Sequence, residues 1–216
     1  MTAAPTQFDR RAFLRRAALA LPGAMISPRL ADAAAPGPRS VTDLRYIARA
    51  MPLRRRHEWT RIQPVPERLR VATRNRYSQI TLHHIGYDIV TAKTEEEVVR
   101  VLDGVLGGHL RRNFGDIGYH FLIDYTGRVW EGRSLAYWGA HVSGHNERNL
   151  GIVLLGNFER QRPSAPQLDA MQKLTHLVRH QYRIPQGRIY GHIDLGQTLC
   201  PGRYLYPKVQ RLNQLA

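Results

Sequence analysis

Residues 78–84 read SQITLHH, a segment in which apolar and polar residues alternate before two adjacent histidines. Such alternation, with β-branched and apolar residues, is typical of a β-strand that is packed in a sheet. Because neighbouring side chains of a strand point to opposite faces, His83 and His84 cannot both reach the same ion. The segment therefore predicts a strand that presents one histidine to each face of a sheet.

Four further segments carry strand patterns. Residues 117–124 and 129–131 flank a turn sequence, which predicts two neighbouring strands. Residues 150–155 form a nearly continuous apolar run, which is typical of a central strand covered on both faces. A short strand is expected at residues 189–192, and it ends in His192.

Two helices are expected between these strands. A capping box begins at Thr94, and apolar residues then recur at helical spacing to about Asn113. A second capping box begins at Ser164, and Pro185 and Gly187 are expected to end its helix. Strands interleaved with two helices indicate a single α/β domain, with a central mixed β-sheet flanked by helices.

The composition agrees with one globular domain. The chain has 216 residues, of which 43% are hydrophobic, and no apolar run is long enough for a stable membrane span. The net charge of +15 suits either nucleic acid or an anionic cell envelope. The arginines are scattered and no nucleic-acid-binding motif is recognisable, so we expect no nucleic-acid partner. We also expect a monomeric protein.

The first 35 residues resemble an export signal. The adjacent arginines Arg10 and Arg11 precede a mild apolar stretch, and Ala33 and Ala35 fit a small-x-small cleavage rule. This pattern resembles a twin-arginine signal, so we expect residues 1–35 to direct export to the periplasm or the cell exterior. The alternative is a basic, alanine-rich tail.

Residues 36–76 are rich in proline and arginine and have no clear period. They are interpreted as a linker and irregular lead-in, with a short helix at Val41–Met51 for which Thr42 could be the cap. Residues 77–216 are then the folded domain.

Two histidines and the single cysteine are candidate metal ligands. A catalytic zinc site uses three protein ligands and leaves one position open. His83 and His192 each lie at the end of a predicted strand, and the loop from His192 to Cys200 can curl back to one ion. A buried, inert cysteine is the alternative for Cys200, which has no second cysteine for an internal disulfide.

Several short motifs occur in a fixed order, and they span most of the chain from about Trp59 to Tyr206. Together they resemble the type-2 N-acetylmuramoyl-L-alanine amidase and peptidoglycan recognition protein family. Each motif is weak alone, but the combination is specific. The motifs are His83-His84 after an apolar strand, Ile117-Gly118-Tyr119-His120-Phe121, Glu131-Gly132-Arg133, Gly139-Ala140-His141, Asn149-Leu150-Gly151-Ile152, and Gly191-His192 with Asp194 through Cys200-Pro201-Gly202.

The resemblance implies a zinc ion held by His83, His192 and Cys200. It also implies hydrolysis of the amide bond between N-acetylmuramic acid and L-alanine, with peptidoglycan or muropeptides as the substrate. Members that only bind peptidoglycan typically lack the cysteine ligand, so Cys200 favours an enzyme over a non-catalytic peptidoglycan-binding module on the same fold.

The resemblance further implies roles around the metal. Tyr119 matches the catalytic tyrosine, Thr198 matches a position that often assists catalysis, and His141 matches a position in the substrate groove. Ile85 and Ile193 depart from the usual residues of the motifs without removing a ligand. From the residues alone, a half-buried sheet tyrosine, a loop threonine bonded to its own backbone and a structural histidine are the alternatives.

Other polar residues near the motifs are weaker candidates. Glu131 is considered as a base only because a motif contains it. His84 and His120 are expected behind the ligands or on the opposite strand face. The remaining histidines, His109 among them, are interpreted as surface or structural residues.

Overall fold

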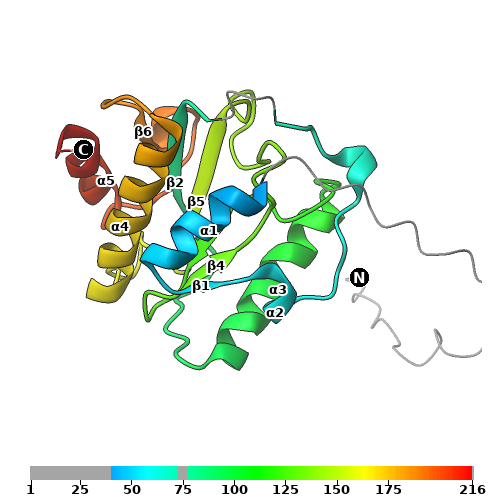
Figure 1. Ribbon diagram of the computed structural model, residues 1–216. Coiled ribbons are helices and arrows are strands. Elements are labelled where there is room, and N and C mark those ends of the chain that lie inside the picture. The colour runs from blue at the N-terminus through cyan, green and yellow to red at the C-terminus, as the bar shows by residue number, and fades with distance from the viewer. Residues whose placement is uncertain (1–39, 73–76, 216) are drawn as a thin grey trace, which may run out of the picture. The chain divides into compact units, whose positions relative to one another are not determined.

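The computed structural model describes residues 40–72 and 77–215 (Figure 1). Helices and strands alternate along these residues. The helices are α1 (Ser40–Ala50), α2 (Arg56–Trp59), α3 (Glu95–Arg111), α4 (Ala165–Tyr182) and α5 (Tyr206–Leu215), with the 3-10 turns η2 (Pro66–Arg68) and η3 (His192–Asp194). The strands are β1 (Leu53–Arg54), β2 (Gln79–His84), β3 (Phe121–Ile123), β4 (Val129–Glu131), β5 (Asn149–Leu154) and β6 (Ile189–Gly191).

The six strands form one mixed sheet. Their order is β1-β4-β3-β5-β2-β6. β3 and β4 are antiparallel, and the other neighbouring pairs are parallel. This single α/β domain, with helices on both faces of a mixed sheet, confirms the fold class predicted from the sequence.

The two long helices begin at their predicted caps. The Thr94 hydroxyl accepts a hydrogen bond from the Glu97 N–H at 3.2 Å before α3. The Ser164 hydroxyl accepts one from the Gln167 N–H at 3.1 Å before α4. Both are complete capping boxes, which satisfy N–H groups that a helix start leaves unpaired. α4 ends before Pro185, because Arg183 adopts a left-handed conformation with φ of 52°.

One face of the sheet is closed by α1, α4 and α5. Alternate residues of β2, such as Ile80 and Leu82, share one core cluster with Leu174 of α4 and Val209 of α5. Burying each such side chain is worth about 1.5–3 kcal/mol relative to leaving it in water. This closed face therefore supplies much of the driving force that holds the domain together.

The opposite face is only partly covered. Leu122 of β3, Trp130 of β4 and Val153 of β5 pack in a second cluster with α3 and with Trp59 of α2. Within the described residues, β2 and β6 contribute no side chain to this cluster. The strip of sheet over β2 and β6, where His83 lies, is therefore left without a covering helix.

Strand register brings the two histidines together. β2 is parallel to β6, and Leu82 lies opposite Gly191. His83 is the residue after Leu82, and His192 is the residue after Gly191. Both histidines therefore lie at the same edge of the sheet. Loops that follow the carboxyl ends of neighbouring parallel strands commonly build binding sites in such folds.

Part of the expected lead-in is packed in the domain. The short helix predicted there is observed as α1, and its Leu44, together with Met51 just after the helix, is buried in the closed-face core. α1 begins before Thr42, so this residue lies inside the helix and not at its cap. The Trp59 indole N–H also donates to the Glu131 carbonyl at 2.8 Å.

The two ends of the chain differ from the central residues in how far the sequence predicts them. The predicted export signal at residues 1–35 lies outside the described residues. Helix α5 is not predicted by the sequence pattern, yet its Val209 and Leu212 are buried beside β6. Among the residues that the structure describes, no helix combines the length and apolarity of a membrane span.

Candidate metal centre

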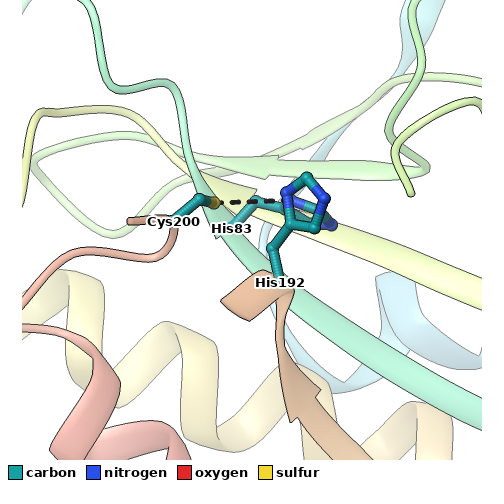
Figure 2. Close-up of side chains that lie close together, drawn as sticks. All are labelled: His83, His192 and Cys200. Carbon is teal, nitrogen blue, oxygen red and sulfur yellow. Dashed lines mark hydrogen bonds between the residues drawn. The ribbon is translucent and has the colours of Figure 1, made fainter. Parts of the chain in front are cut away.

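Three side chains from distant parts of the sequence meet beside the end of β2. His83 lies on β2, His192 follows β6 directly, and Cys200 lies on the loop beyond. Their ligand atoms all lie within 4.8 Å of one another, and Figure 2 shows the three side chains converging. The structure thus brings together the three residues that the sequence predicted as metal ligands.

The loop from His192 to Cys200 is closed by backbone hydrogen bonds. The Ile193 N–H donates to the Cys200 carbonyl at 2.7 Å, which brings the cysteine back beside His192. The Asp194 carboxylate accepts from the Gly191 N–H at 2.7 Å and also from the Tyr206 hydroxyl. These bonds fix the turn that carries His192, so the ligand loop is tied to both β6 and α5.

The donor set fits zinc. Zinc binds imidazole nitrogen at about 2.0–2.1 Å and thiolate sulfur at about 2.3 Å, and a tetrahedral angle places two such atoms about 3.6 Å apart. The Cys200 Sγ and the His83 Nδ1 are 3.6 Å apart. In the part of the chain that the structure describes, no fourth His, Cys or carboxylate joins the cluster. A zinc ion held here by His83, His192 and Cys200 would keep one coordination position open.

The protonation states suit metal binding. Burial lowers the pKa of His83 well below its ordinary value, and the neighbouring His141 and His192 lower it further. Burial also lowers the pKa of His192, so both imidazoles are neutral near pH 7. Burial raises the pKa of the Cys200 thiol to about 12, while the His84 N–H at 3.3 Å acts in the opposite direction. The thiol must therefore release its proton when a metal binds.

His141 lies directly behind His83. Its Nδ1 is 3.0 Å from the His83 Nε2, and its Nε2 is 3.2 Å from the Asn149 carbonyl oxygen. Burial is the main cause that lowers the pKa of His141 well below its ordinary value. Both ring nitrogens of the residue predicted to contact substrate therefore have partners inside the protein, although the residue also lines the cavity described next.

A large cavity opens beside the three ligands. Its volume is about 1420 Å³, and Tyr119, His192, Thr198 and Cys200 line it. The other wall is formed by α3 and the residue that follows it. This wall includes Glu97, Arg100, Val101, Gly104, Gly108 and Arg111 of α3, and Arg112 just after the helix.

The sequence interpretation missed this helix wall. Glu97, Arg100, Gly104, Gly108 and Arg111 recur every three or four positions, which places them on one side of a helix, so the signal was present. His109 was interpreted as surface or structural, and it is buried with its Nδ1 accepting from the Gly118 N–H at 2.8 Å. Burial lowers the pKa of His109 to about 4, and the residue also lines the cavity.

Tyr119 lies in the cavity wall close to His83. Its ring centroid is 5.1 Å from that of His83. Among the described residues, no hydrogen-bond partner of the Tyr119 hydroxyl is found, and the Tyr119 side chain lines the cavity. Burial and the neighbouring Cys200 raise the pKa of Tyr119, so its proton is retained at neutral pH. The hydroxyl is therefore available as a donor to a bound molecule.

Two other candidates differ in their surroundings. The Thr198 hydroxyl oxygen accepts from the Cys200 N–H at 3.1 Å, and its own proton remains available to donate. Glu131 instead forms an ion pair with Arg55, whose Nε lies 2.8 Å away, and also accepts from the Arg56 N–H. Glu131 therefore holds α2 against β4, and it does not line the cavity.

The histidines next to the ligands have structural partners. The His84 Nδ1 accepts from the Phe158 N–H at 3.0 Å. The His120 Nδ1 accepts from the Gly151 N–H at 3.0 Å. Neither belongs to the ligand cluster. These contacts agree with the expectation that His84 and His120 lie behind the candidate ligands or on the opposite strand face.

The family of this chain follows from comparison of its sequence with known families. The profile of the N-acetylmuramoyl-L-alanine amidase family matches residues 73–203, which include all three candidate ligands and most of the domain. The chain belongs to this family.

Individual relatives agree with that assignment. Peptidoglycan-recognition protein SD of Drosophila simulans is 39% identical over 102 residues, which are 47% of this chain and 55% of that protein. This chain thus spans little more than half the length of that curated relative. The crystal structure of Drosophila peptidoglycan recognition protein SD matches with a TM-score of 0.67 and 28% identity, covering 74% of this chain and 94% of that one.

A bacterial enzyme shares the fold. N-acetylmuramoyl-L-alanine amidase LysC from Clostridium intestinale URNW matches with a TM-score of 0.60 and 23% identity, over 76% of this chain and 96% of that one. A protein named for peptidoglycan recognition and a protein named for amide hydrolysis thus share this fold.

Proposed function

We propose that the protein is a zinc-dependent N-acetylmuramoyl-L-alanine amidase, which cleaves the amide bond between N-acetylmuramic acid and the L-alanine of the stem peptide. The observation that carries this proposal is the set of His83, His192 and Cys200 beside a large cavity. A protein that only recognised peptidoglycan would need the cavity and no metal ligands.

A bound zinc ion supplies Lewis-acid chemistry, since it activates water as a nucleophile and polarises a carbonyl oxygen. His83, His192 and Cys200 would hold the ion, and two of these residues, His192 and Cys200, also line the cavity. The Tyr119 hydroxyl retains its proton and has no competing partner among the described residues, so it donates to the oxyanion that develops from the scissile carbonyl.

Thr198 acts next to this donor. Its oxygen accepts from the Cys200 N–H, so its own proton is free to donate to a molecule in the cavity that Thr198 lines. We assign it the role of positioning the attacking water or the scissile carbonyl. His141 lines the same cavity, and its contact with substrate remains a prediction that the experiment of the next subsection tests.

The substrate class is peptidoglycan or its muropeptide fragments. The relatives named peptidoglycan-recognition proteins support this class, as does the cavity volume of about 1420 Å³. We further propose that residues 1–35 direct export to the periplasm or the exterior, where such a substrate is present. That part of the proposal is supported by the paired arginines and the small-x-small segment.

The test is product analysis on purified sacculi. Zinc-loaded protein is incubated with sacculi, and the soluble products are identified by mass spectrometry. We expect stem peptides with a free L-alanine amino terminus, and glycan strands that keep the lactyl carboxylate. Cleavage within the glycan or within the stem peptide would contradict the proposal.

The alternative is a non-catalytic peptidoglycan-binding module, which the names of the recognition-protein relatives favour. The same incubation separates the two functions. A binding module would sediment with the sacculi and release no peptide, whether or not zinc is present.

A further inference from the structure

The hydrogen bonds behind His83 have a fixed direction. The Asn149 backbone carbonyl can only accept, so the His141 Nε2 at 3.2 Å must carry the proton. A neutral imidazole has one N–H, and the His141 Nδ1 is therefore the bare nitrogen that accepts. His141 and Asn149 are both buried, so water does not compete for these bonds.

The same reasoning shows which nitrogen of His83, the metal ligand, carries a proton. The bare His141 Nδ1 faces the His83 Nε2 at 3.0 Å, and this contact is a hydrogen bond only if the His83 Nε2 carries a proton. The other nitrogen of His83 is then bare. That nitrogen is Nδ1, which faces the Cys200 Sγ at 3.6 Å on the metal side. The chain of bonds thus leaves the ligand lone pair free where a metal would bind.

The His141 ring is held in a slot between two glycines. A Cβ at Gly139 would lie 2.3 Å from the His141 Cδ2, and a Cβ at Gly151 would lie 2.5 Å from the same atom. Any side chain at these positions would displace the ring. The backbone of His141 is also fixed, because its N–H donates to the Asn146 Oδ1 at 2.8 Å. The ring therefore cannot easily rotate to another set of partners.

We propose that His141 is a positioning residue for the metal site: it orients the His83 ring and fixes its tautomer through the relay from the Asn149 carbonyl to the His83 Nε2. This inference rests on the zinc site of the proposed function and gives His141 a role other than contact with substrate. Partners that fix the tautomer and orientation of a histidine ligand typically contribute 10–100-fold to metal affinity.

The first test is zinc affinity, measured by competition with a chromophoric chelator. His141→Leu removes the acceptor for His83, and we expect zinc to bind about 10–100-fold more weakly. His141→Asn keeps an acceptor, since the Asn Oδ1 occupies the place of the imidazole Nδ1, and it should restore most of the lost affinity. Zinc affinity of His141→Leu equal to that of the wild type would overturn the proposal.

The matched control is His109→Leu. His109 is also a buried imidazole in the cavity wall, but it accepts from the Gly118 N–H and contacts no ligand nitrogen. We expect its removal to leave zinc affinity unchanged. An equal loss of zinc affinity in both leucine variants would mean that the effect comes from disturbing the cavity wall, and it would overturn the relay.

The second test needs no variant to fold. Long-range proton–nitrogen NMR of the zinc-free wild type reports the tautomer of each histidine, and we expect His83 to carry its proton on Nε2 and His141 to carry its own on Nε2. A proton on the His83 Nδ1 would overturn the proposal.

Failure of the relay is distinguishable from failure of the amidase proposal. Wild-type protein that binds zinc tightly but releases no stem peptide would contradict the amidase and leave the relay standing. If His141→Leu instead keeps wild-type zinc affinity and loses muropeptide binding, His141 belongs to the substrate groove and the relay is wrong.

Discussion

The two faces of the sheet differ most at β2, and the difference explains where the chemistry lies. On one face Leu82 is buried in the cluster that α1, α4 and α5 complete. One residue further along the same strand, His83 points to the face that α3 leaves uncovered, beside a cavity of about 1420 Å³. A closed face supplies stability, and an incompletely covered face supplies room for ligands and substrate.

From this comparison we expect that a substitution on the open face can abolish activity while the domain stays folded. Cys200→Ala removes one of the three proposed metal ligands, and we expect sacculus hydrolysis to fall to background while the circular dichroism spectrum is retained. The matched control is Leu199→Ala, because Leu199 is exposed and does not line the cavity. Full activity of Cys200→Ala would contradict the zinc assignment.

The closed face should behave in the opposite way. Leu174→Ala creates a cavity in the core between α4 and the sheet, and we expect it to lower the free energy of unfolding by about 2–5 kcal/mol. Zinc affinity of the folded protein should remain unchanged, since Leu174 lies on the far side of the sheet from His83. Denaturant titration and chelator competition measure the two quantities. A loss of zinc affinity without a loss of stability would contradict the division between the faces.

Tyr119 lies on the open face but is not a candidate metal ligand. Its substitution therefore separates an effect on catalysis from an effect on metal binding. Tyr119→Phe removes one hydroxyl donor, and we expect turnover to fall about 10²–10³-fold, the usual loss for one oxyanion donor. Bound zinc should stay at one ion per chain, measured by atomic emission. Loss of zinc from this variant would mean that the tyrosine is part of the metal site.

Much of this arrangement was predictable from local sequence patterns. The strand before His83, the capping boxes at Thr94 and Ser164, and the apolar run of β5 all depend on neighbours in sequence, and each is confirmed. The three candidate ligands were identified by motif resemblance, and the structure brings their side chains together.

The remaining features depend on contacts between residues far apart in sequence. The segment before β2 looks irregular because its polar residues outnumber its apolar ones, yet Leu44 and Met51 complete the closed core. Helix α5 is polar along most of its length and is held by two buried residues. His141 pairs with His83 across 58 positions, which no local pattern could indicate.

The zinc affinity should depend on pH through a single group. Burial raises the pKa of Cys200 to about 12, so the thiol is protonated at neutral pH and binding releases its proton. The ligand histidines are already neutral because burial lowers their pKa, and they release none. We therefore expect the affinity to rise about tenfold per pH unit between about pH 6 and 9, in chelator competition. An unchanging affinity over this range would contradict thiolate ligation.

The smallest expected effect concerns the helix wall of the cavity. A Cβ at Gly104 would meet no atom within 4 Å, so alanine fits there without strain. Gly104→Ala should raise the free energy of unfolding by about 0.5–1 kcal/mol, because glycine is a poor residue for a helix interior. Gly151→Ala is the contrasting variant, since its Cβ would collide with His141, and it should destabilise. Denaturant titration of both variants decides the point, and destabilisation by Gly104→Ala would contradict an open wall.

The central claim is that two imidazoles and one thiolate hold a zinc ion with one position open. X-ray absorption at the zinc edge of the loaded protein measures this directly. We expect two imidazole nitrogens at about 2.0–2.1 Å, one sulfur at about 2.3 Å and one further light atom from water. The sulfur contribution should be absent from Cys200→Ala. A wild-type spectrum without sulfur would contradict the account.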